Sequence, residues 1–357
     1  MVSGRRARAT SRRDALSTFS STGRADRLVQ AGGLGPADIF ALISDRLARC
    51  EVLFRESLES PVSIVDEIGT FVGETGGKRV RPTLHLLCAK LCDYRGPHDI
   101  VLGTVLEFIH SATLIHDDII DGASTRRGRP SVNENWGSSI TVLFGDYLFA
   151  KAMQMALRAG SLAVMDTLAQ VTLRMVEGEM IQTRYEGRTD LSEQEYVDLV
   201  ERKTAALFSA CGELAGILAG VDESKMRALS AYGRNLGMAF QVVDDLLDFI
   251  GDAKRLGKPA AADLREGKAT LPVIDLLQTG SSEARTLARA IVEQEGDVDD
   301  SVRRLTAMMA ENGSLQRAQE RAEQYAANAA LELVNFPDNP ARRALQSLPD
   351  LLLSRDR

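Results

Sequence analysis

Apolar side chains recur at intervals of three or four residues along most of the chain. Ile39, Leu42, Ile43 and Leu47 show this spacing near residue 40, and similar runs continue toward the C-terminus. A repeat of about 3.6 residues is typical of helices that bury one face, whereas a half-buried strand alternates with a repeat of two. Since no stretch combines sustained alternation with β-branched residues, we expect an all-α protein without strands.

Clusters of Gly, Pro, Asp and Ser divide the helical pattern into segments, because these residues favour turns. The predicted breaks lie at residues 73–78, 93–97, 122–130, 187–191, 251–269, 280–282, 313 and 337–340. Residues 140–156 and 236–250 are apolar on nearly every side, which indicates central helices covered by others. The polar pair Lys203-Thr204 interrupts a third run. Since no repeat of fixed period is present, the segments predict one large helical bundle.

Residues 1–33 differ from the rest of the chain in composition. They are rich in Arg, Ser and Thr, poor in acids, and lack the apolar run that a secretory signal or a membrane span needs. We therefore expect a basic, disordered tail at residues 1–33, a single domain at residues 34–357, and no transmembrane segment. We expect a cytoplasmic location; a mitochondrial transit peptide has the same composition as the tail, so the mitochondrial matrix is the alternative.

Charge and cysteine content narrow the choice of partners and compartment. The formal net charge of −7 argues against nucleic acid as a partner. The four cysteines are too few and too scattered for a disulfide framework. They are Cys50, Cys88, Cys92 and Cys211. Reduced, buried thiols are therefore expected.

Two strongly apolar segments each contain the pattern Asp-Asp-x-x-Asp. The aspartates are Asp117, Asp118, Asp121, Asp244, Asp245 and Asp248. Burying carboxylates is costly unless cations or hydrogen bonds compensate them. Positions four apart share a helix face, and oxygen ligands on one face suit Mg²⁺, which also takes oxygens from water and substrate phosphates. One such pattern is more often a solvated helix face, but two copies predict a metal-dependent site between facing helices.

Basic and polar residues lie beside both acidic segments, as the binding of a diphosphate would require. Lys78, Arg79 and Arg81 follow two glycines at the start of a predicted helix, where backbone N–H groups also favour anions. The others that follow or precede the acidic patterns are Arg126, Arg127, Lys203, Thr204, Gln241, Lys258 and Lys268. Each of them taken alone could equally be a surface charge. Their common placement beside the acidic segments is what predicts a phosphate site.

From about residue 40 onward, the chain resembles the trans-isoprenyl diphosphate synthase family. The resemblance is carried by Gly-Gly-Lys-Arg-x-Arg-Pro at 76–82, by the first acidic pattern with Arg126-Arg127-Gly128, by Lys203-Thr204, and by Gly-x-x-Phe-Gln-x-x-Asp-Asp-x-x-Asp at 237–248. It implies the isoprenoid synthase fold, a helical bundle surrounding a central cavity. It also implies a homodimer that transfers prenyl groups from an allylic prenyl diphosphate to isopentenyl diphosphate.

The resemblance also assigns roles to individual residues. It implies that Asp117, Asp121 and Asp244 bind about three Mg²⁺ ions, and that Asp118, Asp245, Asp248 and Lys203 also serve catalysis. The diphosphate of isopentenyl diphosphate would be held by Lys78, Arg81, His110 and Arg127. The allylic diphosphate would be held by Arg126, Lys203, Thr204, Gln241 and Lys258. His116 is expected to support the neighbouring aspartates. Without the motifs around it, His110 could equally be interpreted as a core residue.

The helix preceding Asp117 bears on product length. Thr113 and Ile109 lie one and two turns back, each turn advancing about 5.4 Å, which is close to one isoprene unit. Family members that make short products carry a bulky aromatic residue in this region, whereas Ala112 and Thr113 are small. The resemblance therefore implies a long-chain product of about six to ten isoprene units. Candidates for the floor of the tunnel, by helical phase, are Met153, Leu157, Leu173 and Val176.

Several alternatives stay open. A product of farnesyl or geranylgeranyl length is possible, and so is a catalytic subunit that needs a second chain. A class I terpene cyclase shares the first acidic pattern but normally lacks the second one and the basic loop. An HD-type metal phosphohydrolase is suggested by His85, His110 and His116-Asp117, but it leaves the second acidic pattern unused. A regulatory prenyl synthase subunit tends to lose the acidic patterns, and both are intact here.

Overall fold

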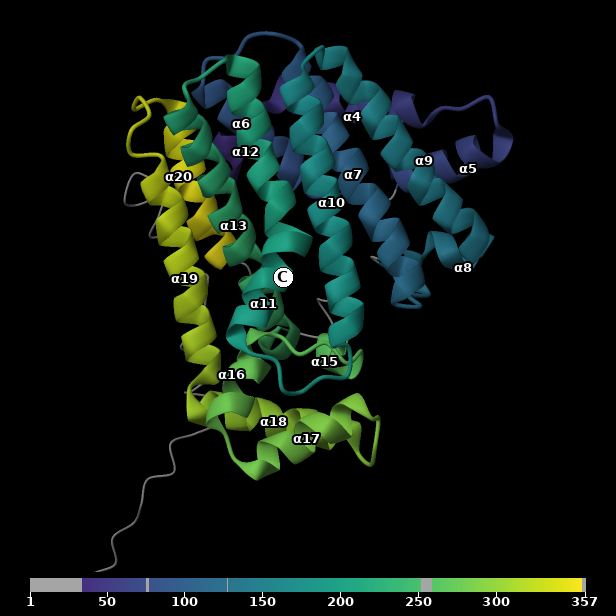
Figure 1. The fold of residues 1–357 in the computed structure, drawn as a ribbon, viewed down its shortest axis with the longest axis vertical. Helices are drawn as coiled ribbons and strands as arrows, with labels where there is room; N and C mark the ends of the chain where they lie inside the picture. Colours follow the sequence, from purple (N-terminus) through teal and green to yellow (C-terminus); the bar gives the residue numbers. More distant parts are fainter. Residues whose placement is uncertain (1–33, 75–76, 127, 252–258, 355–357) are drawn as a thin grey trace, which may run out of the picture.

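The computed structural model describes residues 34–74, 77–126, 128–251 and 259–354, which form a helical bundle (Figure 1). The predicted tail at residues 1–33 lies outside the described residues. In chain order, the helices are α3 (Pro36–Ala41), α4 (Ser44–Leu58), α5 (Ser63–Glu74), α6 (Val80–Leu91), α7 (His98–Ile120), α8 (Val132–Trp136), α9 (Ser138–Ala156), α10 (Leu162–Tyr185), α11 (Glu193–Val200), α12 (Ala206–Ala219), α13 (Glu223–Ile250), α15 (Ala262–Arg265), α16 (Leu271–Thr279), α17 (Ser282–Val292), α18 (Val298–Asn312), α19 (Ser314–Glu332) and α20 (Pro340–Leu353).

The all-α prediction is confirmed, with one small exception. Two strands of two residues, β1 (Thr125–Arg126) and β2 (Arg129–Pro130), form an antiparallel hairpin after α7. The expectation of no strand is therefore wrong at this point. Two residues are too short to produce a detectable alternation of apolar and polar positions, so the sequence pattern contains no signal for this hairpin.

Helices α7 and α13 form the centre of the bundle. α7 packs against α4, α6, α9 and α12, while α13 packs against α12 and α19. Leu236, Val242 and Leu246 of α13 are buried, as expected for a central helix. α17 and α18 lie at one end of the bundle, next to α16 (Figure 1).

The prediction that residues 140–156 form a central helix is wrong. α9 packs against α7 on one face, but Val142 and Leu143 on another face are 42% and 63% exposed. The outward face of α9 contains large apolar side chains as well, so composition alone cannot distinguish a buried helix from one with an exposed apolar surface.

Helix boundaries near the site follow from capping side chains. At the start of α13, Asp222 accepts a hydrogen bond from the backbone N–H of Lys225 at 3.0 Å. At the start of α11, Ser192 and Glu195 accept from each other's backbone N–H groups and form a capping box. Such caps satisfy the free N–H groups of the first helical turn and determine where each helix begins.

A π-helical turn, η2 (Glu201–Ala205), joins α11 to α12 where Lys203-Thr204 interrupts the apolar run. π turns are rare and often accompany functional sites, because the extra residue shifts the side chains that follow. The turn packs closely on α10 at Gly178, where an added Cβ would lie 2.8 Å from the backbone nitrogen of Lys203. The polar interruption is therefore a local change of helix type rather than a break.

Two segments, His98–Ile120 and Ser138–Ala159, are long and apolar enough to cross a membrane by length and composition. Most of the first is buried inside the bundle, as expected for the core helix of a folded domain, and one or two such segments are weak evidence for membrane spans. The cysteines are free, and Cys50, Cys88 and Cys211 are buried as predicted.

Candidate active site

An apolar cavity with a volume of about 450 Å³ lies beside the first acidic motif, between α7, α10, η2 and α13. We call it the main cavity. Its lining residues are Arg81, His110, Thr113, Leu114, His116, Asp117, Ile120, Phe149, Met175, Val176, Glu179, Met180, Lys203, Thr204, Phe240 and Gln241. Polar groups line one part of it and apolar side chains of α7, α9 and α10 line the rest.

A second cavity, of about 190 Å³, contains two of the three acids of the second motif, Asp244 and Asp245, and we call it the acidic cavity. Asp244, Asp245, Asp263 and Lys268 line it. The residues that line both cavities are Lys203, Thr204 and Gln241. The two cavities therefore adjoin at the π turn, and the two acidic motifs contribute to one continuous region.

The surroundings of Asp117 disfavour a negative charge on its side chain. Burial raises its pKa to about 6; the charge of Lys203 opposes this rise, whereas those of Glu179 and Asp121 add to it. An ionised carboxylate at this position lacks full compensation, so it favours the approach of a cation. The donor set of Asp117 and Asp121 consists of oxygens, which fits Mg²⁺.

Lys268 connects the two acidic motifs. Its ammonium group donates to Asp121 of the first motif at 2.8 Å and to Glu266 at 2.9 Å, while its side chain lines the acidic cavity beside Asp244. One lysine side chain thus binds Asp121 of the first motif and lines the cavity that contains Asp244 of the second. In the described part of the chain, no three acidic, His or Cys side chains lie close enough to form a complete metal cluster. A metal here would need oxygens from a substrate as well, as is usual for Mg²⁺.

Asp245 is buried and orients its neighbours. Tyr196 donates its hydroxyl to Asp245 at 2.5 Å, and Gln241 donates its amide to Asp245 at 2.9 Å. The hydroxyl of Thr204 donates to Gln241 at 2.9 Å. Burial, together with the charge of Asp263, raises the pKa of Asp245 to about 8, although the hydrogen bonds from Tyr196 and Gln241 oppose this rise. This chain of hydrogen bonds fixes the rotamers of Thr204 and Gln241 where the two cavities meet.

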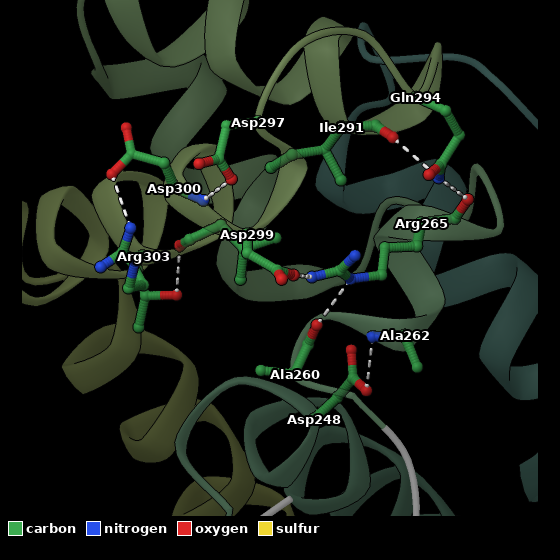
Figure 2. A network of polar contacts seen from close by, with 12 residues as sticks. Asp248, Ala260, Ala262, Arg265, Ile291, Gln294, Asp297, Asp299, Asp300 and Arg303 are labelled. Carbon is green, nitrogen blue, oxygen red and sulfur yellow. Dashed lines mark hydrogen bonds and ion pairs between the residues drawn. The ribbon is translucent and has the colours of Figure 1, made fainter.

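Two of the predicted catalytic aspartates hold neighbouring segments. Asp118 is buried and accepts from Arg126 at 2.6 Å, so it positions the hairpin that follows α7. Asp248 accepts from the backbone N–H groups of Ala262 and Asp263 at 3.0 and 3.2 Å, and Figure 2 shows its carboxylate directed toward the start of α15. Neither lines the main cavity or the acidic cavity. A direct role for them in catalysis stays a prediction.

Among the predicted phosphate ligands, Arg81 and His110 line the main cavity. The guanidinium of Arg81 lies 5.0 Å from the centroid of the Phe208 ring; burial lowers its pKa and the charge of Glu107 raises it. Within the described residues, its Nε atom has no hydrogen-bond partner and is buried, so it can bind an anion. Lys78 is exposed. Arg127 and Lys258 lie outside the described residues.

The predicted chain-length residues occupy different environments. Thr113 lines the main cavity, whereas Ile109 and Ala112 are fully buried in the core. Of the proposed floor residues, Val176 lines the cavity. Met153 is partly buried against the core. Leu157 and Leu173 are 63% and 60% exposed, so their assignment to the floor is wrong. Helical phase identified an apolar face correctly, but α9 and α10 each have a second apolar face directed outward.

Among the cavity-lining residues that sequence reasoning missed, four bear most on the chemistry of the site. They are Phe149, Glu179, Tyr196 and Asp263. Glu179 lies 2.5 Å from the ammonium of Lys203, and the ring of Phe149 stacks on His116 at 6.0 Å. Glu179 follows Val176 by one turn of α10, and this shared helix face was an available signal. Asp263 belongs to no motif, so only the fold brings it to Asp244.

A helical bundle with an acidic, lysine-containing cavity next to an apolar one defines an enzyme that handles an anionic group attached to an apolar chain. The sequence profile of the family described as Polyprenyl synthetase matches residues 62–309, and the chain belongs to this family. It is a member of the trans-polyprenyl diphosphate synthases. This family membership removes the support for the terpene cyclase and HD-type hydrolase alternatives. His85 itself is buried, with Nδ1 2.9 Å from the carbonyl oxygen of Cys211.

Characterised relatives span nearly the whole chain. Octaprenyl diphosphate synthase of Escherichia coli is 36% identical over 316 residues, covering 88% of this chain and 98% of the relative. Nonaprenyl diphosphate synthase of Mycobacterium tuberculosis is 36% identical over 330 residues, covering 90% and 96%. A crystal structure of a polyprenyl synthase from Caulobacter crescentus, complexed with calcium and isoprenyl diphosphate, superimposes with a TM-score of 0.85 at 34% identity, covering 90% of this chain and 98% of that one.

Proposed function

We propose that the chain condenses isopentenyl diphosphate with an allylic prenyl diphosphate, in a Mg²⁺-dependent reaction, to give a long-chain all-trans polyprenyl diphosphate. One observation carries the proposal: the cavity with the acids adjoins the apolar cavity, and Lys203, Thr204 and Gln241 line both. A diphosphate at this junction can project its prenyl chain between α7 and α10. The name of the calcium-containing relative supports a divalent cation as the partner of the diphosphate.

The residues of the junction fit the charge that develops in such a reaction. Asp117, Asp121 and Asp244 would hold Mg²⁺, which when bound stabilises the negative charge of the departing pyrophosphate. Lys203 and Lys268 would stabilise the same charge directly, because both residues line the acidic cavity and carry positive charges. Arg81 and His110 hold the diphosphate of isopentenyl diphosphate on the side of α6 and α7.

The covalent steps need no nucleophilic side chain. The allylic C–O bond breaks and leaves a carbocation next to apolar groups such as Phe149 and Phe240, which exclude water. The double bond of isopentenyl diphosphate attacks the cation and forms the new C–C bond. Loss of a proton, accepted by the released pyrophosphate, restores an allylic diphosphate that is one unit longer.

The proposal is tested by incubating the purified protein with Mg²⁺, labelled isopentenyl diphosphate and allylic primers of several lengths. We expect pyrophosphate release only when both substrates are present, together with extracted products of more than four isoprene units. Release from an allylic diphosphate alone would indicate a hydrolase or a cyclase. Inactivity of the purified chain that is relieved by a second protein would indicate a heteromeric enzyme.

Relatives of similar identity differ in product length. The names of the octaprenyl and nonaprenyl synthases at 36% identity favour a long product, whereas a geranylgeranyl diphosphate synthase of Sulfolobus acidocaldarius is 34% identical. The small side chain of Thr113 on the wall of the main cavity supports the long-chain alternative.

Thr113→Phe should shorten the product by one or more isoprene units, because a phenyl ring at this position obstructs the main cavity near Asp117. The measurement is the chain-length distribution on reversed-phase chromatography. Thr113→Val keeps the shape of the side chain and should leave the distribution unchanged. An identical distribution for the Phe variant would refute the assignment of this cavity to the growing chain. Ala112→Phe is less informative, because Ala112 is fully buried in the core.

We also propose that two copies of the chain associate through the outer faces of α9 and α10. Large apolar side chains gather along these helices and the turn between them, and such surfaces usually mark protein contacts. They are Val142, Leu143, Leu157, Leu162 and Leu173. Leu143→Glu combined with Leu173→Glu should shift the protein from dimer to monomer in sedimentation velocity. Val52→Glu, at an exposed apolar site on α4, is the control. A wild-type monomer would contradict the proposal.

A further inference from the structure

Arg79 has an unusual backbone conformation for a residue with a side chain. It is the N-cap of α6, with φ of 48° and ψ of 38°, in the left-handed region. Residues other than glycine rarely occupy this region unless the surrounding structure holds them there. In the sequence, Arg79 lies with Lys78 and Arg81 in one basic loop, but the backbone conformation of Arg79 directs its side chain toward other residues.

The side chain of Arg79 is held by two carboxylates and an aromatic ring. Its Nε and Nη2 atoms donate to Glu51 of α4, the latter at 3.1 Å, and its Nη1 donates to Glu107 of α7 at 2.7 Å. The guanidinium also lies 5.0 Å from the centroid of the Phe54 ring. The side chains of Arg79 and Glu107 are only 12% and 8% exposed. Charge-assisted hydrogen bonds in such a buried setting hold their partners in a defined geometry.

These contacts connect two parts of the proposed binding site for isopentenyl diphosphate. Arg79 lines a separate small cavity with Glu107, whereas Arg81, two residues later, lines the main cavity. Glu107 precedes His110 by about one turn of α7, and His110 borders both cavities. The contact from Arg79 to Glu107 therefore joins the start of α6, which carries Arg81, to the turn of α7 that carries His110.

We propose that Arg79 is a positioning residue that fixes the distance between Arg81 and His110 and thereby sets the affinity for isopentenyl diphosphate. Arg79 does not contact the substrate; it acts through Glu51 and Glu107. This inference rests on the proposed function, since it concerns the second substrate of that reaction. Lysine cannot replace Arg79 fully, because a single ammonium group cannot reproduce the planar fork that reaches both carboxylates.

The decisive variant is Arg79→Gly, because glycine adopts the left-handed backbone without strain and removes only the side-chain contacts. We expect the KM for isopentenyl diphosphate to rise about ten- to a hundredfold, as small misplacements of binding groups commonly cause. The KM for the allylic diphosphate and kcat at saturating substrates should stay within about twofold of wild type. Arg79→Lys should give an intermediate KM. Arg95→Gly, which removes an arginine side chain that is 83% exposed, is the control and should match wild type.

A double-variant cycle adds a second readout. Arg79→Gly and Glu107→Gln should each raise the KM for isopentenyl diphosphate, and the combined variant should show less than the product of the two increases, because both remove the same contact. A wild-type KM in Arg79→Gly would overturn the inference, as would equal increases for both substrates. If wild-type protein releases no pyrophosphate with the two substrates, the proposed function itself fails, which is a different result.

Discussion

Asp117→Asn is expected to lower kcat/KM for the allylic diphosphate by about a hundredfold to a thousandfold at saturating Mg²⁺. Asparagine preserves the size of the side chain but removes the charge that draws a cation into a partly buried position. Because burial already raises the pKa of Asp117 to about 6, the neutral side chain should not destabilise the fold. The loss should therefore appear in kinetics and in the Mg²⁺ concentration needed for half-maximal rate, with an unchanged circular dichroism spectrum.

Asp166→Asn is the matched control, since Asp166 is an exposed residue of α10 that accepts a hydrogen bond from Gln170. It should keep wild-type activity and wild-type dependence on Mg²⁺. Near-normal activity of Asp117→Asn would exclude the carboxylate of Asp117 from the metal site, and the role of the first acidic motif would need revision.

Gly178→Ala is expected to reduce kcat/KM by about ten- to a hundredfold through displacement of Lys203. A Cβ atom at Gly178 would lie 2.8 Å from the backbone nitrogen of Lys203 and 3.1 Å from Cβ of Arg202. Both atoms belong to residues of the π turn, so α10 and η2 must move apart to make room for the added Cβ atom. Lys203 lines both cavities, and its ammonium would leave its position beside Asp117. The overpacking should also lower stability by about 1–3 kcal/mol, measurable by denaturant unfolding.

Gly73→Ala provides the comparison, because a Cβ atom there would lie 3.6 Å from the side chain of Leu58, an ordinary contact. In this position of α5, alanine should be neutral or stabilising by about 0.5–1 kcal/mol, with full activity. If Gly178→Ala retains wild-type kinetics, the close approach of α10 to the π turn has no part in placing Lys203.

Both acidic motifs could be selected from the sequence as candidate functional sites because their chemistry conflicts with their surroundings. Asp117 and Asp244 lie in apolar helices, and a charge in such a place requires a compensating partner. The pattern therefore indicates function without knowledge of the fold. The same argument could not separate the roles within each motif. Asp118 and Asp248 have the same local pattern as their neighbours, yet they pair with Arg126 and with the backbone of α15.

Apolar periodicity predicted the helices well and the surroundings of each helix poorly. The run at residues 140–156 predicts a central helix, but α9 has an exposed apolar face, and Leu157 and Leu173, both predicted to lie inside, are exposed. The apolar character of a helix face indicates that the face is shielded from water. It does not indicate whether the shielding residues belong to the same chain or to another one.

The order of residues by itself determined the helical class, several of the breaks between helices, and the two carboxylate patterns with their nearby cations. These properties depend on neighbours within a few positions, where helix geometry relates spacing to direction. Only the tertiary structure decided that Lys268 reaches Asp121, that Asp263 joins Asp244, and that Arg79 turns away from Arg81 toward Glu107. Such contacts join segments that are distant in sequence, and they arise from the packing of whole helices, for which no local pattern carries a signal.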